Sequence, residues 1–218
     1  MAVSPRPGRR GFAFNRGRWP QTGFATEAIL ARIKLPPLNE MTPEQKSAYE
    51  EAAGGKRGHA PAPMIAWLQN PEFARRAQKL GELMRYETVL PPRLSELAIL
   101  IVARHWTAHF EWQAHKRDAL KAGVSPEVIA SIAAGNIPDL ATEEERMVYR
   151  IATTLLETRA VPDLLYQEGV RVLRERGVVD LVGILGYYTL VAMTLNTFEI
   201  GLPEATQADL IGTPQAGR

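Results

Sequence analysis

Apolar side chains recur about every three to four residues along most of the chain, which is the period of an amphipathic helix. Leu94, Leu97, Ala98 and Ile101, for example, share one face of such a helix. The pattern predicts helices over residues 42–52, 71–87, 92–105, 108–122, 126–134, 142–157, 163–175 and 179–197. Segments that alternate apolar and polar residues are essentially absent, so we expect an all-α fold.

Residues typical of helix ends bracket these segments. Thr42, Ser125 and Thr142 each precede a helical run as N-cap residues, and Gly123 and Gly135 are natural helix stops. We find no internal repeat and no second domain. We therefore expect one helical domain over residues 33–203, preceded by a basic, disordered extension (1–32) and followed by a tail (204–218).

One segment raises the question of a membrane. Residues 181–198 carry no charge over eighteen positions, which is near the lower limit for a membrane-spanning helix. Polar side chains interrupt the run at Tyr187, Tyr188, Thr189, Thr194 and Asn196. An apolar helix buried in a core or a subunit interface fits this composition better, and we expect no membrane partner.

Charge is distributed unevenly along the 218 residues. The first 24 residues hold five arginines and no acid, and subtracting those charges from the formal net charge of +2 leaves −3 for residues 25–218. The basic balance therefore comes from the extension, and we expect no nucleic-acid partner for the folded part.

The chain has no cysteine, while 45% of its residues are hydrophobic and 23% are charged. These proportions are ordinary for a soluble globular protein. The lack of cysteine excludes disulfides, thiolate nucleophiles and cysteine-bound metal centres. It leaves the redox compartment undecided and suits a cytoplasmic enzyme, which is the location we expect.

Three of the four histidines lie within eleven residues, at His105, His109 and His115. Imidazole changes charge near neutral pH, so this cluster is the first place to expect proton chemistry or a metal. On a helix, His105 and His109 share one stripe, whereas Glu111 and His115 share another. Two such pairs on one straight helix do not converge on a metal, although a break near Thr107 would change that.

Glu111 and His115 are open to two interpretations: a carboxylate that orients a general acid–base imidazole, or an ordinary surface pair. Glu96 flanks the buried face of its helix. It is either a buried carboxyl with a raised pKa, or a surface acid paired with Arg93 or Arg104.

The run Leu-Pro-Pro-Arg-Leu-Ser-Glu-Leu-Ala-Ile-Leu at 90–100, followed by His-Phe-Glu-Trp at 109–112 and by His115, resembles the carboxymuconolactone decarboxylase family. That superfamily also contains the alkyl hydroperoxidase D-like proteins. The resemblance covers roughly residues 35–203. It implies a single-domain helical bundle of the alkyl hydroperoxidase D-like type that assembles as a trimer or hexamer.

The peroxidase branch of this superfamily carries a glutamate, eleven residues, Cys-x-x-Cys, three residues and a histidine. On this chain the glutamate corresponds to Glu96 and the histidine to His115, but the cysteine positions hold Ala108 and Glu111. Thiolate attack and disulfide resolution both need sulfur, so dithiol reduction of a hydroperoxide is excluded. The pattern resembles the cysteine-free, decarboxylase-like branch.

The resemblance implies a lyase that removes CO₂ from a small carboxylated lactone or enone without a cofactor or a metal. In the implied proton relay, His115 is the acid–base group, Glu111 orients it and Glu96 is a buried relay. Candidates for binding substrate anions are Arg85, Arg104 and His109. We expect the loop at 54–63 to shape the substrate end of the pocket.

Two alternatives from other functional classes remain open. One is a catalytically silent helical oligomer that binds a ligand or a partner. The other is a metal-dependent enzyme that uses His105, His109 and His115.

Overall fold

The computed structural model describes residues 31–202 and 206–211. Within these residues the chain forms eight helices and no strand, which confirms the predicted all-α class. The helices are α1 (Pro43–Gly54), α2 (Met64–Trp67), α3 (Pro71–Tyr86), α4 (Pro92–His105), α5 (His109–Lys121), α6 (Pro126–Ala134), α7 (Glu143–Thr158) and α8 (Asp163–Thr197). Residues 1–30, which hold most of the predicted basic extension, lie outside the described part of the chain.

The helix ends form where the sequence places cap residues. Thr42 accepts a hydrogen bond from the Gln45 amide at 3.2 Å, and the Gln45 side chain accepts one from the Thr42 amide at 3.0 Å. Thr142 and Glu145 form the same reciprocal capping box at the start of α7. Gly135 ends α6 in the left-handed region at φ 76°, where a residue without a Cβ carries no strain.

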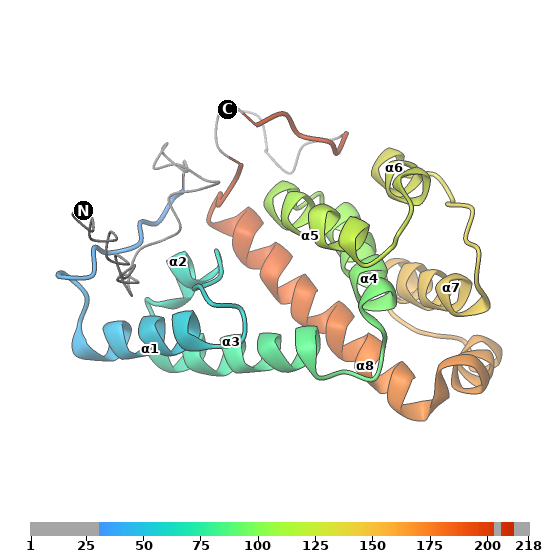
Figure 1. Ribbon diagram of the computed structural model, residues 1–218, viewed down its shortest axis with the longest axis horizontal. Coiled ribbons are helices and arrows are strands. Elements are labelled where there is room, and N and C mark those ends of the chain that lie inside the picture. Colours follow the sequence, from blue (N-terminus) through green and yellow to red (C-terminus); the bar gives the residue numbers. More distant parts are fainter. Residues whose placement is uncertain (1–30, 203–205, 212–218) are drawn as a thin grey trace, which may run out of the picture.

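Helix α4 lies in the middle of the molecule. All residues at 94–103 are buried, so this helix is covered on every side, and its buried surface is apolar apart from Ser95 and Glu96. It packs against α5, α7 and α8, while α1 and α2 pack against α3 on the far side of α8 (Figure 1). Each fully buried leucine or isoleucine contributes about 1.5–3 kcal/mol, so α4 is the main hydrophobic anchor of the bundle.

Helix α8 consists of two helices that meet at a kink, so the separate helices expected at 163–175 and 179–197 are both present, with the break slightly earlier than expected. The two parts meet at Arg174, whose backbone leaves the helical region with φ 64° and ψ 164°. By length and composition alone, α8 passes as a membrane span, but 56% of its most apolar window is buried inside the molecule. Leu181 and Ile184 have no exposed surface. This packing is that of a core helix.

The structure differs from the predicted elements in one further respect. Helix α2 was not predicted, because its four residues are too short to show a helical period. The other helices begin and end within two residues of the expected bounds, and within α8 the break lies at Arg174, a few residues before the expected one.

The described ends of the chain pack onto the bundle. The amide of Arg32 donates a hydrogen bond to the carbonyl of Phe198 at 2.8 Å, so the two ends lie side by side. In the segment 206–211, Asp209 accepts hydrogen bonds from Trp112 at 3.1 Å and Lys116 at 2.7 Å, both on α5. Part of the segment that we assigned to the tail therefore contacts the bundle.

Candidate functional site

Glu96 and His115 form a buried pair between α4 and α5. The Glu96 carboxylate lies 2.7 Å from Nδ1 of His115, and the two residues are only 7% and 5% exposed. An ionised carboxylate only accepts hydrogen bonds, so it holds the proton of the imidazole on Nδ1 and leaves Nε2 as the second reactive nitrogen. Among the described residues Nε2 has no hydrogen-bond partner. A carboxylate held against an imidazole in this way is an arrangement that is chemically capable of proton transfer.

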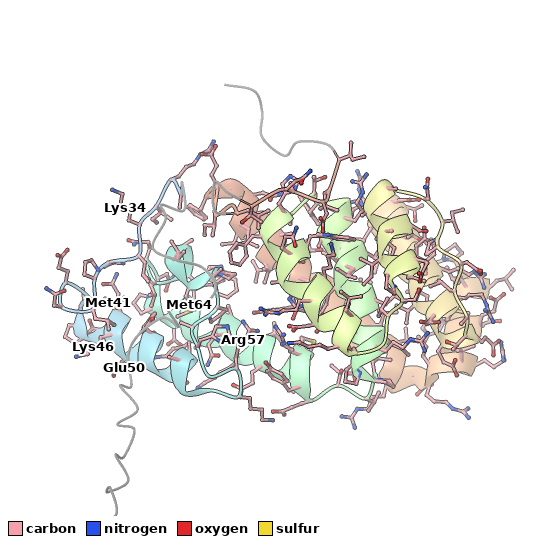
Figure 2. The ribbon with its side chains drawn as sticks, turned by 45° about the horizontal axis from the view of Figure 1, so that its top comes forward. Lys34, Met41, Lys46, Glu50, Arg57 and Met64 are labelled. Carbon is pink, nitrogen blue, oxygen red and sulfur yellow. The ribbon has the colours of Figure 1, made fainter. Side chains whose placement is uncertain are left out.

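His115 lines a cavity of about 110 Å³ between the loop after α1 and helices α3, α5 and α8. Arg57, labelled in Figure 2, lies on this loop near the middle of the view. The loop also contributes His59, Pro61, Ala62 and Pro63 to the cavity wall. Residues of the segment 54–63 therefore form part of the wall of the cavity that His115 lines.

The carboxyl group of Glu111 takes no part in the hydrogen bond between Glu96 and His115. Glu111 lines the same cavity and is 2% exposed, but neither of its oxygens has a hydrogen-bond partner within the described structure. Burial without a compensating charge raises the pKa of Glu111 well above its ordinary value. The prediction that Glu111 orients His115 is wrong, because Glu96 occupies Nδ1.

Positive charge gathers around the cavity. Arg57, Arg85 and Arg117 all line it, and Arg85 forms an ion pair with Asp118. Desolvation, together with the charge of Arg57, lowers the pKa of His59, so this histidine is neutral near pH 7. The arginines suit a substrate that carries carboxylates.

Two tyrosines of α8 form the opposite wall. The ring of Tyr188 meets the ring of His115 edge-on at 4.9 Å, and its buried hydroxyl has no hydrogen-bond partner among the described residues. Burial raises the pKa of Tyr188, and it raises that of Tyr187 to about 12. The hydroxyl of Tyr187 lies against Gly81 of α3, where an added Cβ would be only 2.0 Å from that oxygen. Both tyrosines stay protonated at neutral pH.

Two of the predicted anion-binding residues lie elsewhere. Arg104, in the last turn of α4, places its guanidinium against Gly135 at the end of α6. His109 begins α5 and is half-buried, with a pKa lowered by desolvation. Neither residue lines the cavity that holds His115, whereas Arg85 does. The prediction that all three bind substrate is therefore supported by the geometry for Arg85 alone.

The histidine cluster does not converge on a metal site. His105 is exposed at the end of α4, whereas His115 is buried against Glu96. In residues 31–202 and 206–211, no group of three or more histidine, aspartate or glutamate side chains is placed to hold a metal ion. The alternative of a site built from His105, His109 and His115 is therefore contradicted.

Sequence reasoning missed several residues of the cavity: Arg57, His59, Arg117, Asp118, Tyr187 and Tyr188. The loop residues gave only the general signal of an irregular segment. The two tyrosines were noted as polar interruptions in an apolar run, and a buried polar side chain in such a run is the signal that could have found them.

Comparisons with known proteins bear on the fold and the family. Residues 71–154 match the carboxymuconolactone decarboxylase family. No curated protein matches the chain. The crystal structure of an alkylhydroperoxidase AhpD core protein, an uncharacterized peroxidase-related protein from Ralstonia eutropha JMP134, has a similar fold. The TM-score is 0.63 at 16% identity, with 80% of this chain and 93% of that chain covered. The chain is therefore similar to the carboxymuconolactone decarboxylase family over residues 71–154, and its fold is similar to that of an AhpD core protein.

Proposed function

We propose that the protein is a cofactor-independent acid–base enzyme that decarboxylates a small carboxylated lactone or enone. The observation that carries the proposal is the buried Glu96–His115 pair, which opens on a cavity rimmed by arginines. A general acid near carbon and an anchor for carboxylates are the two needs of such a reaction. The similarity of residues 71–154 to a family that is named for a decarboxylase supports a catalytic role.

In the proposed reaction, Arg57 and Arg85 attract the substrate carboxylates. The bond from carbon to the leaving carboxylate breaks, CO₂ departs, and the electron pair passes into the conjugated lactone. His115, protonated on both nitrogens at this stage, gives its Nε2 proton to a carbon of the resulting dienolate. Glu96 stabilises the imidazolium until the transfer, and solvent returns the proton for the next turnover.

Thiol-dependent peroxide chemistry is not part of the proposal. The similar fold belongs to a protein described as peroxidase-related, and at 16% identity that likeness concerns the fold alone. This sequence has no cysteine, and the positions that would carry the two thiols hold Ala108 and Glu111. The superfamily's fold is present here with a proton-transfer pair and without a sulfur nucleophile.

The test is the decay of 4-carboxymuconolactone, followed by ultraviolet absorbance, with purified wild-type protein and His115→Ala. We expect decay above the spontaneous rate, and we expect the His115→Ala variant to lose it. His105→Ala is the matched control, because His105 is exposed and lies outside the cavity. Wild-type protein that leaves the lactone at its spontaneous rate would eliminate this substrate, and equal activity in His115→Ala would remove His115 from the chemistry.

A further inference from the structure

Two buried residues that line the same cavity have polar atoms without a hydrogen-bond partner in the part of the chain that the structure describes. They are the carboxyl group of Glu111 on α5 and the hydroxyl group of Tyr188 on α8, with residue exposures of 2% for each. A buried polar atom without a hydrogen bond lowers stability, so each such group in a native structure needs an explanation. Their position on one cavity indicates that a ligand supplies the missing partner.

The chemistry of the two groups defines that ligand. Glu111 forms no ion pair with another described residue, and its burial favours the neutral acid, which has an O–H to donate. The phenol of Tyr188 is likewise protonated and a donor. Two neutral donors suit an acceptor oxygen that carries negative charge. A carboxylic acid that an apolar site keeps neutral can donate a hydrogen bond to such an oxygen.

The surroundings favour an anion at this position. Arg85 is close enough to Tyr188 for its charge to oppose the rise in that residue's pKa, and Arg57 acts in the same way. The edge-on contact of Tyr188 with His115, at 4.9 Å, brings the proton donor of the proposed reaction next to these groups. A delocalised anion held here would expose a carbon to His115.

We propose that the Glu111 carboxyl and the Tyr188 hydroxyl form an oxyanion site that binds the oxygen of an enolate or a phenolate. In the reaction this oxygen is that of the dienolate, so the catalytic use of the site rests on the proposed function. Binding of such an anion does not depend on decarboxylation. It is therefore measurable with a molecule that does not react.

The probe is 4-nitrophenol, titrated into the full chain at a pH about one unit below the phenol's own pKa, with the phenolate absorbance as readout. We expect the bound molecule to be phenolate. Tyr188→Phe and Glu111→Leu each remove one donor, and binding weakens about tenfold or more, the usual loss for a hydrogen bond to a charged group. Glu111→Gln keeps an N–H donor and binds within a few-fold of wild type.

Matched controls are Tyr166→Phe and Glu50→Gln, which change exposed residues outside the cavity and leave the titration unchanged. Thermal melting verifies that each variant folds. If Glu111→Leu fails to fold, an infrared difference spectrum of wild type against Glu111→Gln carries the test, because a neutral Glu111 contributes the carbonyl band of a protonated acid at neutral pH.

Each contrary result overturns the site. The first such result is a bound probe that stays a neutral phenol. The second is a Tyr188→Phe variant that binds the probe as tightly as the wild type does. The third is an infrared spectrum that lacks the band of a protonated acid. Tighter binding by Glu111→Gln is another, since it would reveal a charged carboxylate in the wild type. Phenolate binding without lactone decay would contradict the proposed decarboxylase function and support the oxyanion site. Lactone decay without phenolate binding would support the function and contradict the site.

Discussion

At the scale of single residues, the Glu96 carboxylate occupies Nδ1 of His115 and leaves Nε2 as the ring nitrogen that would meet the proposed substrate. In Glu96→Gln the amide can present either its oxygen or its N–H₂ to Nδ1, so the imidazole loses its fixed tautomer and the support for its positive charge. We expect kcat for the lactone to fall by about 10²–10⁴-fold with little change in KM. Steady-state kinetics measure this, with Glu50→Gln as control, and a change in KM alone would contradict it.

Glu111 makes stability depend on pH. Burial raises its pKa in the folded chain above the unfolded value near 4.5, so the folded state holds this proton more tightly. The contribution of Glu111 to the free energy of unfolding is complete below about pH 4.5 and is lost as pH rises through the pKa of Glu111 in the folded chain. Over that window the free energy of unfolding falls by at most about 1.4 kcal/mol per pH unit.

We therefore expect Glu111→Gln to have a flatter profile of unfolding free energy against pH over that window, and a higher free energy than wild type at its upper end. Urea unfolding at a series of pH values measures both. Parallel profiles for the two proteins would mean that Glu111 titrates alike in the folded and unfolded chains.

The residue types of the proton pair were predictable, but their pairing was not. Spacing along one helix indicated Glu111 as the partner of His115, because the two lie one turn apart on α5. The actual partner comes from α4, nineteen positions earlier in the chain. A contact between helices depends on how their faces pack, and no pattern within one helix contains that information.

At the scale of elements, two glycines offer a matched test of how α3 meets α8. Alanine at Gly81 would place its Cβ 2.0 Å from the Tyr187 hydroxyl, so α3 or the tyrosine must move. Gly186 lies on α8 with no atom within 4 Å of an added Cβ. We expect Gly81→Ala to lower the free energy of unfolding by about 1–3 kcal/mol, and Gly186→Ala to raise it by about 0.5–1 kcal/mol. Urea unfolding measures both, and equal effects would contradict the close packing at Gly81.

Helix starts and stops were predictable because capping is local chemistry. The boxes at Thr42 and Thr142 and the stop at Gly135 depend on side chains within three residues of the helix end. The break between the last two predicted helices is present, but its exact place at Arg174 was not predictable. A positive φ at an arginine is held by surrounding packing, not by local preference.

At the scale of the whole molecule, the segment 206–211 is attached to α5 mainly through Asp209. Its carboxylate accepts hydrogen bonds from Trp112 and from Lys116, and its side chain is 30% exposed. We expect Asp209→Ala to lower the free energy of unfolding by about 1 kcal/mol, a value reduced by solvent screening of the lysine contact. Tryptophan fluorescence during urea unfolding measures it. Asp139→Ala, at an exposed position, is the control, and an equal loss there would contradict the attachment.

We further propose that the protein assembles as a homo-oligomer. Several large apolar side chains of α8 are exposed in the single chain: Leu164, Tyr166, Val179, Val182 and Met193. Covering such a surface with a second copy removes apolar area from water. We expect light scattering to give a trimer or a hexamer, and Val179→Glu to shift the mass toward the monomer. A monomeric wild type would contradict the proposal.

The sequence predicted more of the fold than of the candidate site. Helical period, caps and the family resemblance together led to an all-α bundle, because each is repeated over many residues. The cavity wall depends on a loop without periodicity, so its individual members, such as Arg57 and His59, were out of reach.

That loop also separates two properties of the protein that can change independently. The proton-transfer pair sits on α4 and α5, inside the hydrophobic core, whereas Arg57, His59 and three neighbouring cavity residues belong to one short connection between α1 and α2. Residues 60–63 of this connection are buried, whereas residues 54–59 are exposed or half-buried, and changes in such a surface segment disturb a helical core little. Selection for a new substrate could therefore remodel this connection alone, and a transplanted loop would carry one protein's substrate preference onto another's unaltered reaction centre.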